Sequence, residues 1–542
     1  MRKQFKEAIP DSWTWVRLSD LGTWRGGGTP SKARPEFWTN GTIPWVSPKD
    51  MKIDRIKDAE DHITEEAVAS SATNLIDAGA VLVVTRSGIL ERTLPVAVTE
   101  VAIALNQDLK ALSPHKGIAP GYLAAALHRF EKEILHSCSK SGTTVASIEF
   151  PSLLGFELPI APTAEQKRIV AEIEKQSSDL EAGVAALKRV QANLKRYRAS
   201  VLKAACEGRL VPTEAELART EGRDYEPADK LLERILKERR TKWETQQLAK
   251  MNSPGKSIKG DAWKSGYEGP TPTDPSVLPP LPPGWTWATV HQVSAAEPNA
   301  ITDGPFGSNL KTEHYTAAGP RVVRLQNIGD GIFVDEKAHI APEHFDRLSK
   351  HRLFKDDVVI AALGEVLPRA CMVPESLGPA IVKADCIRVK PDQRLCLPQY
   401  LMMALNSEPT RRRTAKIVHG VGRPRMNLGE IKAIAVPLPP LAEQIRISAE
   451  VERRFSLIGE VEKLARTNLL RATNLRHAIL RQAFDGRLLP QDPTDEPAST
   501  LIERIRLQHS PPAPVQSAPE QLPLNLEKPK KSRIPRRRSS SS

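Results

Sequence analysis

The chain has few cysteines, and their spacing fits neither a disulfide framework nor a zinc site. Its 542 residues contain five cysteines, none of them in a CxxC pair, and one is left over in any disulfide scheme. We therefore expect a reduced chain without a structural zinc ion. No apolar run approaches the roughly 20 residues of a membrane-spanning helix, and residues 1–6 lead into no signal-peptide core. These absences predict a cytoplasmic protein without a membrane partner.

The sequence also lacks the motifs of several catalytic classes. It has no GxxxxGK[ST] loop for a nucleoside triphosphate, no HExxH cluster for a metal ion and no Asn-Pro-Pro signature of a methyltransferase. The glycine run Gly26–Gly28 has neither the GxGxxG spacing nor a following helix, so it is predicted as a turn. We expect no catalytic residue, no metal site and no cofactor bound by this chain.

Positive charge is in excess. The formal net charge is +13 and the sequence pI is about 9.4, which favours a polyanionic partner such as nucleic acid. Part of this excess lies in residues 510–542, which are rich in proline, serine, lysine and arginine. We predict a disordered basic tail there, which would add non-specific affinity for DNA.

The strongest pattern in the chain is a duplication. Trp13–Trp15 returns as Trp285–Trp287, and the stretch that begins at Pro159 returns at Pro437, a shift of 278 residues (437 − 159). Two further echoes follow in the same order: Cys206–Leu210 matches Phe484–Leu488, and Pro227–Ile235 matches Pro497–Ile505. Two copies in one chain predict a pseudo-twofold architecture, which suits a pseudo-twofold partner such as duplex DNA.

Each repeat is predicted to contain one long helix, from about Ala164 to Cys206 and from Ala442 to Phe484. Apolar residues recur every seven positions, and large residues of one helix match small ones of the other, which favours an antiparallel pair within the chain. The predicted seam residues are Ile169, Ile173, Leu180, Leu187, Leu194 and Val201 in the first helix and Ile447, Val451, Ile458 and Ile479 in the second, with Ala465 and Ala472 at further seam positions and Val461 and Leu475 on the companion row.

The fold class predicted is α+β: two mixed α/β domains joined by two long antiparallel helices that form an intramolecular coiled coil. The expected boundaries, in chain order, are 1–160 for the first domain, 161–209 for the first long helix, 210–240 for a short helical segment, 241–280 for a proline-rich linker, 281–437 for the second domain, 438–487 for the second long helix, 488–509 for another short helical segment and 510–542 for the tail.

Several motifs occur within this frame. The first repeat carries Arg25–Ser31, Ile43–Met51 and Asn106–Leu109, the second carries Asp303–Lys311 and Arg324–Ile328, and the long helices open with Thr163–Gln166 and Leu441–Gln444. In this order, and twice, they resemble the target recognition domains and conserved regions of the specificity subunit of type I restriction–modification systems, over roughly residues 9–508.

The resemblance implies a DNA-binding subunit that is not itself an enzyme. Each recognition domain would read one half of a split, asymmetric target in double-stranded DNA, and the helix pair would set the spacing between the halves. The partners implied are two methyltransferase subunits, which carry S-adenosylmethionine, and restriction subunits, which carry ATP hydrolysis, Mg²⁺ and cleavage.

Candidate DNA contacts are polar residues within the two β-rich domains, whose interiors differ between the repeats. Arginine can address a guanine edge and glutamine or asparagine an adenine edge, while lysines and hydroxyls suit phosphates. For each of them, a solvated or loop-stabilising role is the alternative. The candidates are Thr29, Ser31, Lys32, Lys49, Arg86, Ser87, Lys140, Ser141, Thr143 and Thr144 in the first domain, and Lys311, Tyr315, Arg324, Gln326, Asn327, Arg369, Lys383, Arg423, Arg425 and Asn427 in the second.

One nuclease-like element is interpreted as structural. Asp108-Leu109-Lys110 becomes Asp385-Cys386-Ile387 in the second repeat, so the aspartate stays while the lysine is lost. A shared aspartate without its lysine favours bonding to a turn backbone over catalysis.

Two other classes of function stay open at this stage. The chain could be a self-sufficient nuclease or methyltransferase with degenerate motifs, which would act on DNA without partners. It could also be a coiled-coil scaffold whose β-rich domains bind proteins, which would show no sequence-dependent, salt-sensitive binding to DNA.

Overall fold

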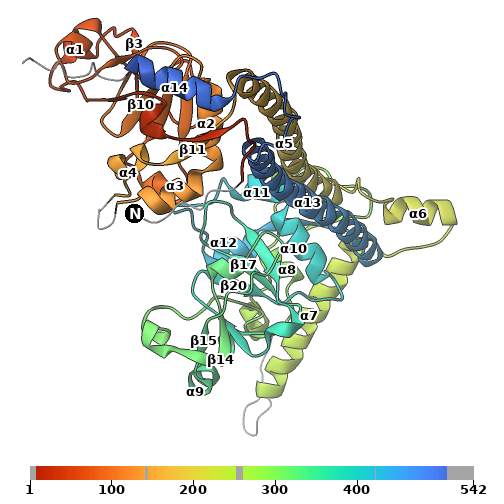
Figure 1. Cartoon of the computed structure of the whole chain (residues 1–542). Helices are drawn as coiled ribbons and strands as arrows, with labels where there is room; N and C mark the ends of the chain where they lie inside the picture. The colour runs from red at the N-terminus through yellow and green to blue at the C-terminus, as the bar shows by residue number, and fades with distance from the viewer. Residues whose placement is uncertain (1–7, 141–144, 252–260, 421–422, 510–542) are drawn as a thin grey trace, which may run out of the picture. The chain divides into compact units, whose positions relative to one another are not determined.

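The computed structural model describes residues 8–140, 145–251, 261–420 and 423–509 (Figure 1). The chain forms two compact units: unit 1 comprises residues 1–181 and 473–542, and unit 2 comprises residues 182–472. We call the β-rich part of unit 1 domain 1 (residues 8–160) and that of unit 2 domain 2 (residues 281–437). No helix in the described ranges is both long and apolar enough to cross a membrane.

Domain 1 is built on two sheets. The first has the strand order β2-β10-β7-β8-β4 and the second β5-β3-β9-β6, while β1 pairs with β11. The central strand β7 is apolar and buried along its whole length, and α2 packs on it and on β8. The bounds are β1 (Thr14–Arg17), β2 (Gly22–Gly26), β3 (Ile43–Val46), β4 (Arg55–Ile56), β5 (Asp61–Ile63), α1 (Glu65–Ala69), β6 (Leu75–Ile76), β7 (Val81–Val84), β8 (Val96–Thr99), β9 (Ile103–Leu105), β10 (Leu109–Pro114), α2 (Pro120–Arg129), α3 (Glu131–Cys138), α4 (Phe150–Leu154) and β11 (Glu157–Ile160).

Domain 2 repeats this plan with different edges. Its sheets have the orders β13-β20-β17-β18 and β15-β14-β19-β16, and β12 pairs with β21 as β1 does with β11. The bounds are β12 (Thr286–Thr289), α8 (Val290–Val293), β13 (Ile301–Thr302), β14 (Tyr315–Val323), β15 (His339–Ile340), α9 (Pro342–Arg347), β16 (Arg352–Leu353), β17 (Val358–Ala361), β18 (Arg369–Met372), β19 (Ala380–Val382), β20 (Cys386–Val389), α10 (Pro398–Asn406), α11 (Glu408–Thr414), α12 (Leu428–Ala433) and β21 (Ala435–Leu438).

The two long helices predicted from the heptad pattern are confirmed as α5 (Thr163–Cys206) and α13 (Leu441–Phe484). Each runs through both units, and within each unit they pair antiparallel. In unit 2 the guanidinium of Arg198 lies 4.9 Å from the centroid of the Phe455 ring, and Val201 shares a core with Val451. In unit 1 Ile169 shares a core with Ala483. The predicted fold of two mixed domains joined by helices is therefore confirmed.

The seam prediction for α13 was partly wrong. Ile447 is buried as expected, but Val461 and Leu475, which were predicted on the companion row, are 42% and 52% exposed. A straight helix drifts by about 20° per heptad against a strict seven-residue repeat, so companion positions rotate away from the partner. The main seam residues Val451, Ile458 and Ile479 are buried.

Each domain is completed by the other repeat. The core of domain 1 includes Phe484 at the end of α13 and Leu501 of the short helix α14 (Ala498–His509). The core of domain 2 includes Val201 near the end of α5 and Leu231 of α7 (Ala228–Met251). Because these closing elements come from the opposite half of the sequence, neither repeat encodes a complete hydrophobic core. A short helix, α6 (Glu214–Glu221), connects α5 to α7.

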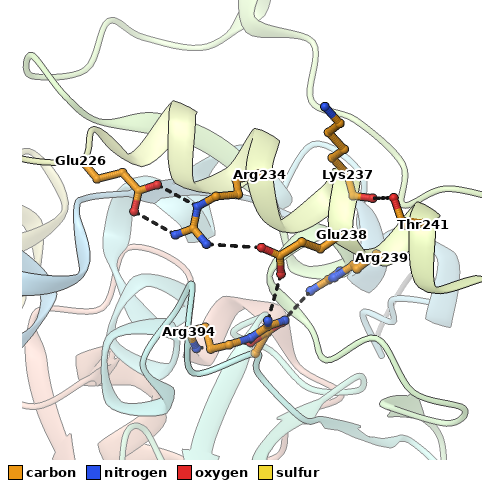
Figure 2. Close-up of polar contacts among 8 residues, drawn as sticks. Glu226, Arg234, Lys237, Glu238, Arg239, Thr241 and Arg394 are labelled. Carbon is orange, nitrogen blue, oxygen red and sulfur yellow. Dashed lines mark hydrogen bonds and ion pairs between the residues drawn. The ribbon is translucent and has the colours of Figure 1, made fainter.

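The proline-rich linker predicted from residue 241 begins later than expected, because α7 continues to Met251 and has 24 residues where α14 has 12. Contacts with domain 2 hold α7 just before this extension (Figure 2). The side chain of Arg239 is buried and ion-paired with Asp392 at 3.6 Å, and Glu238 accepts a hydrogen bond from Arg394 at 3.1 Å. Burial lowers the pKa of Arg239.

The described part of the connector beyond residue 260 also packs within unit 2. Trp263 stacks on Trp243 of α7 with ring centroids 5.9 Å apart, and Tyr267 packs on the same ring. The indole Nε1 of Trp287 donates a hydrogen bond to the carbonyl of Pro279 at 3.0 Å. The described part of the connector is therefore attached within unit 2 at Trp263, Tyr267 and Pro279, which the proline content alone does not predict.

Candidate nucleic-acid interface

Four segments of domain 1 meet where its strands end. The amide of Thr85, after β7, donates to the carbonyl of Asp108 at 2.8 Å, and the amide of Ile148 donates to the carbonyl of Thr85 at 2.8 Å. The amide of Gly28, after β2, donates to the carbonyl of Leu105 at 2.9 Å. We call this surface the loop edge of domain 1; it comprises residues 26–32, 85–87, 106–108, 139–140 and 145–147.

Domain 2 has the same loop edge in equivalent positions. The amide of Ala362, after β17, donates to the carbonyl of Asp385 at 2.8 Å, and the amide of Met426 donates to the carbonyl of Ala362 at 2.9 Å. Its loop edge comprises residues 303–309, 362–364, 383–385, 419–420 and 423–426. The backbone frame is shared, while the side chains that it carries differ between the domains.

A glycine at the same place lets the segments approach in both domains. A Cβ built on Gly27 would overlap the carbonyl oxygens of Leu105 and Asn106, and one built on Gly304 would overlap the backbone of Lys383. Any larger residue would push the first segment of the edge off the turn below it. Gly26 therefore ends β2, and Gly27 and Gly28 follow it as a closely packed loop segment and not as the predicted turn.

The shared aspartates hold the turn through their backbone carbonyls, while their carboxylates contact the side chains of Asn106 and Arg425 instead of the turn backbone that we expected. The carbonyl of Asp108 accepts the amides of Thr85 and Arg86, and the amide of Asp108 donates to the side chain of Asn106 at 2.9 Å. Asp385 lies at φ +66°, and its carboxylate pairs with Arg425 at 2.7 Å. Both residues have structural partners. In the residues that the structure describes, no group of three or more His, Cys, Asp or Glu could hold a metal ion.

Some predicted residues of domain 1 lie on the loop edge. Arg86 is exposed, and its guanidinium has no hydrogen bond or ion pair within the described part of the chain. Thr29 donates a hydrogen bond to Gln107 at 2.5 Å. The ammonium of Lys32 lies 6.0 Å from the ring centroid of Trp38, whose indole donates to the carbonyl of Ser31 at 3.3 Å. Lys140 is exposed at the same edge.

Other predicted residues of domain 1 lie outside the loop edge or have structural partners within it. Lys49 lies outside the loop edge and pairs with Asp61 at 2.9 Å and Glu60 at 3.1 Å, and these carboxylates raise its pKa. The hydroxyl of Ser87 accepts the amide of Ile89 at 3.4 Å and caps a 3-10 turn. Ser141, Thr143 and Thr144 lie outside the described residues.

In domain 2 the edge carries Lys383, Arg423 and Arg425, and Lys383 lies 5.7 Å from the ring centroid of Tyr315. Arg423 is exposed. Arg369, on β18, donates to the carbonyl of Leu325 at 3.3 Å. Lys311, Arg324 and Gln326 lie on segments outside the loop edge; Lys311 pairs with Glu313 at 3.6 Å and Arg324 with Glu336 at 3.9 Å.

Two asparagines have structural roles that argue against DNA contact. Asn327 is 1% exposed, its amide donates to the carbonyls of Val334 and Glu336 at 2.8 and 2.7 Å, and its Oδ1 accepts the amide of Arg324. Asn427 caps α12 and accepts the amide of Glu430 at 2.9 Å. Both side chains already hold backbone, so we withdraw them as candidates.

Gln107 is an edge residue that the sequence reasoning missed. It is exposed between two residues that hold the turn, Asn106 and Asp108. A signal was available, because the equivalent tripeptide of domain 2 is Lys383-Ala384-Asp385, so the central residue changes while the aspartate stays. Guanidinium, ammonium and carboxamide groups therefore share this edge, and they can donate to phosphates and to base edges.

Comparison with known proteins agrees with the architecture. Residues 10–188 match the family described as the type I restriction modification DNA specificity domain. The specificity subunit of the type I restriction enzyme EcoR124I/EcoR124II of Escherichia coli is 45% identical over 161 residues, 30% of this chain and 40% of that subunit. That alignment thus spans less than half of the relative's length.

Longer matches are more distant. The specificity subunit of the type I restriction enzyme EcoBI of Escherichia coli is 24% identical over 401 residues, 72% of this chain and 70% of that subunit. A solved chain from work on complex assembly and conformational transition of the type I R-M system has a TM-score of 0.59 at 15% identity. It covers 89% of this chain and 100% of that chain, which shows a shared fold.

Proposed function

We propose that the chain is a specificity subunit of a type I restriction enzyme and that it selects the DNA sequence on which such a complex acts. Each domain would read one half of a bipartite, asymmetric target in duplex DNA through its loop edge. The observation that carries this proposal is the repetition of one backbone frame with different side chains. Phosphate contacts from a common frame position a protein, while differing side chains specify bases.

The helix pair would fix the unread spacing between the half-sites. Helices α5 and α13 have 44 residues each and run through both units. A continuous helix rises by about 1.5 Å per residue, so its length translates into a distance along DNA. This spacing role is part of the proposal.

In this proposal the chain is the specificity subunit, and the partner subunits carry the catalytic steps. We propose that two methyltransferase subunits bind it and supply S-adenosylmethionine, and that restriction subunits supply ATP hydrolysis, Mg²⁺ and cleavage. A cytoplasmic location beside the host DNA fits these partners. A self-sufficient nuclease or methyltransferase would instead modify DNA as the purified chain alone, and a protein-binding scaffold would show no sequence preference.

Exchange of one domain interior tests the proposal. Residues 16–141 would be replaced by the matching interior of another specificity subunit, and the methylated positions would be mapped across a host genome that expresses the complex. We expect one half of the recognised sequence to change and the other half to stay. A change in both halves, or in neither, would contradict independent reading by the two domains.

A further inference from the structure

We propose that Gln107 reads one base of the half-site bound by domain 1, and that this base is adenine. The inference rests on the proposed function. It names a specificity-determining residue that lies in the motif Asn106–Leu109 but is not among the DNA contacts predicted from the sequence. Three structural observations support it: a fixed turn, an oriented side chain and a natural contrast in domain 2.

The backbone that carries Gln107 is held on both sides. The carbonyl of Asp108 accepts the amides of Thr85 and Arg86 at 2.8 and 3.2 Å. The amide of Asp108 donates to Oδ1 of Asn106 at 2.9 Å, and Gly27 packs directly on the carbonyl of Asn106. Because the turn makes these hydrogen bonds, the backbone of Gln107 is held rigidly while its side chain is exposed. Such a position loses little backbone entropy when it binds a ligand.

The side chain itself is oriented. The hydroxyl of Thr29 donates to Oε1 of Gln107 at 2.5 Å. This bond uses one lone pair of the oxygen and leaves the second lone pair and both amide N–H groups available. An acceptor beside a donor is the pattern that binds adenine in the major groove, where N6–H donates and N7 accepts. Thr29, a residue predicted from the sequence to touch DNA, would then be a positioning residue that acts through Gln107.

Domain 2 provides a contrast within the same molecule. Ala384 occupies the equivalent place, and the amide of Ala362 donates to the carbonyl of Asp385 as that of Thr85 does to Asp108. A methyl group has no hydrogen-bonding capacity, so this position cannot read adenine in domain 2. The frame is kept and the reading group is changed, which is what two domains with different half-sites require.

The surroundings of Gln107 favour nucleic acid over a protein ligand. Arg86 shares the bonded turn, is exposed, and has no side-chain partner among the residues that the structure describes. Lys140 is exposed on the adjoining segment. Cations that flank an oriented carboxamide can hold phosphates while the amide addresses a base edge.

The test uses the chain assembled with its methyltransferase subunits in a host cell, and single-molecule sequencing maps the methylated motif. The wild-type complex should require adenine at one position of the domain 1 half-site. Gln107→Ala should accept all four bases there, with discrimination at that position falling by roughly tenfold or more. Every position of the domain 2 half-site should stay selective. Thr29→Val should weaken the same position to a smaller extent.

Matched controls separate the possible outcomes. Gln246→Ala removes an exposed carboxamide from α7, outside both loop edges, and should leave the motif unchanged. An unaltered motif for Gln107→Ala would overturn the inference, and so would weaker methylation of all sequences alike, because that indicates a phosphate contact. A retained domain 2 half-site in the same data shows that the variant has folded. A wild-type complex without sequence preference would overturn the proposed function itself.

Discussion

The indole Nε1 of Trp13 donates a hydrogen bond to the buried carboxylate of Glu165 at 2.9 Å. Trp285 and Glu443 repeat this bond at 3.1 Å. Each bond ties the start of a domain to the first turn of the long helix that follows it. Burial raises the pKa of both carboxyl groups, while the indole hydrogen bonds oppose the rise. The two tryptophans are therefore anchors between domain and helix.

Removing one anchor should loosen one unit only. Trp13→Phe keeps an aromatic ring in the core of domain 1 but leaves Glu165 without one of its donors. A buried group that loses a partner costs about 1–3 kcal/mol. Hydrogen exchange should rise in peptides of unit 1 and stay unchanged in unit 2, and Trp285→Phe should give the reverse. Equal changes in both units would contradict this assignment.

Replacing the packed glycine of one loop edge should impair sequence recognition by that domain and leave the other domain unaffected. Gly27→Ala forces the segment after β2 away from the Leu105–Asn106 backbone, at a cost of about 1–3 kcal/mol. Methylation mapping should show a degraded domain 1 half-site, and Gly304→Ala should degrade the other. Gly183→Ala is the control: a Cβ there meets nothing within 4 Å, and alanine favours the helix. A Gly27→Ala complex with an intact motif would mean that this edge is not used.

Two adjacent residues of α13 should behave in opposite ways. Ile458 is 2% exposed inside the helix pair, whereas Leu457 is 57% exposed. Ile458→Ala should lower the free energy of unfolding by about 2–5 kcal/mol because it leaves a cavity. Leu457→Ala should change it by less than about 0.5 kcal/mol. Urea unfolding, monitored by hydrogen exchange of the α13 peptide, measures the change in unfolding free energy for both variants. Similar effects for the two variants would rule out the seam.

The stability of domain 2 should depend on one buried acid. Asp357 pairs with Arg388 at 2.8 Å, and burial raises its pKa from 3.8 to about 6 against the opposing charge of Arg388. Because the folded pKa exceeds the unfolded one, folding takes up a proton between these values. The free energy of unfolding should therefore fall as the pH rises from about 4 to about 6 and level off above.

Asp357→Asn removes this titration. The wild type should lose stability relative to the variant as the pH rises through this window, measured by urea unfolding of the protein with hydrogen exchange of the β17 peptide. At neutral pH the variant should be at least as stable as the wild type, because its neutral amide avoids the burial cost that raises the pKa of Asp357. A pH-independent difference would show that Asp357 keeps its usual pKa.

Lengthening both long helices tests the spacing role. One heptad inserted in α5 and one in α13 keeps the seam in phase and adds about 10 Å of helix. At about 3.4 Å per base pair, the unread spacer should grow by roughly three base pairs, while both half-sites keep their sequences. Methylation mapping reads spacer and half-sites in one experiment. An unchanged spacer would remove the helix pair from this role.

Local patterns predicted the elements, and long-range contacts decided the rest. The heptads became α5 and α13, because periodicity within one segment reports its buried face. Gln107 was missed because its orientation comes from Thr29, 78 residues away. Asn327 was misjudged because its partners, such as Val334 and Glu336, follow a loop whose path no sequence rule gives.

The extension of α7 shows the same limit. Residues 237–251 have too few apolar positions to indicate a packed helix, and proline content beyond them predicted a linker. Trp243 stacks on Trp263, and at the start of the segment Arg239 pairs with Asp392 and Glu238 with Arg394. These ion pairs join residues more than 150 positions apart, so composition alone could not reveal them.

Because each domain takes core residues from the other repeat, the two cores are completed at different times during translation. Domain 1 leaves the ribosome first, yet its hydrophobic core waits for Phe484 and for Leu501 and Ile505 of α14, close to the end of the described chain. Domain 2 finds Val201 and Leu231 already made when its strands emerge. Domains generally fold as units while the chain grows. In this protein the domain that is translated first is therefore the last to complete its hydrophobic core.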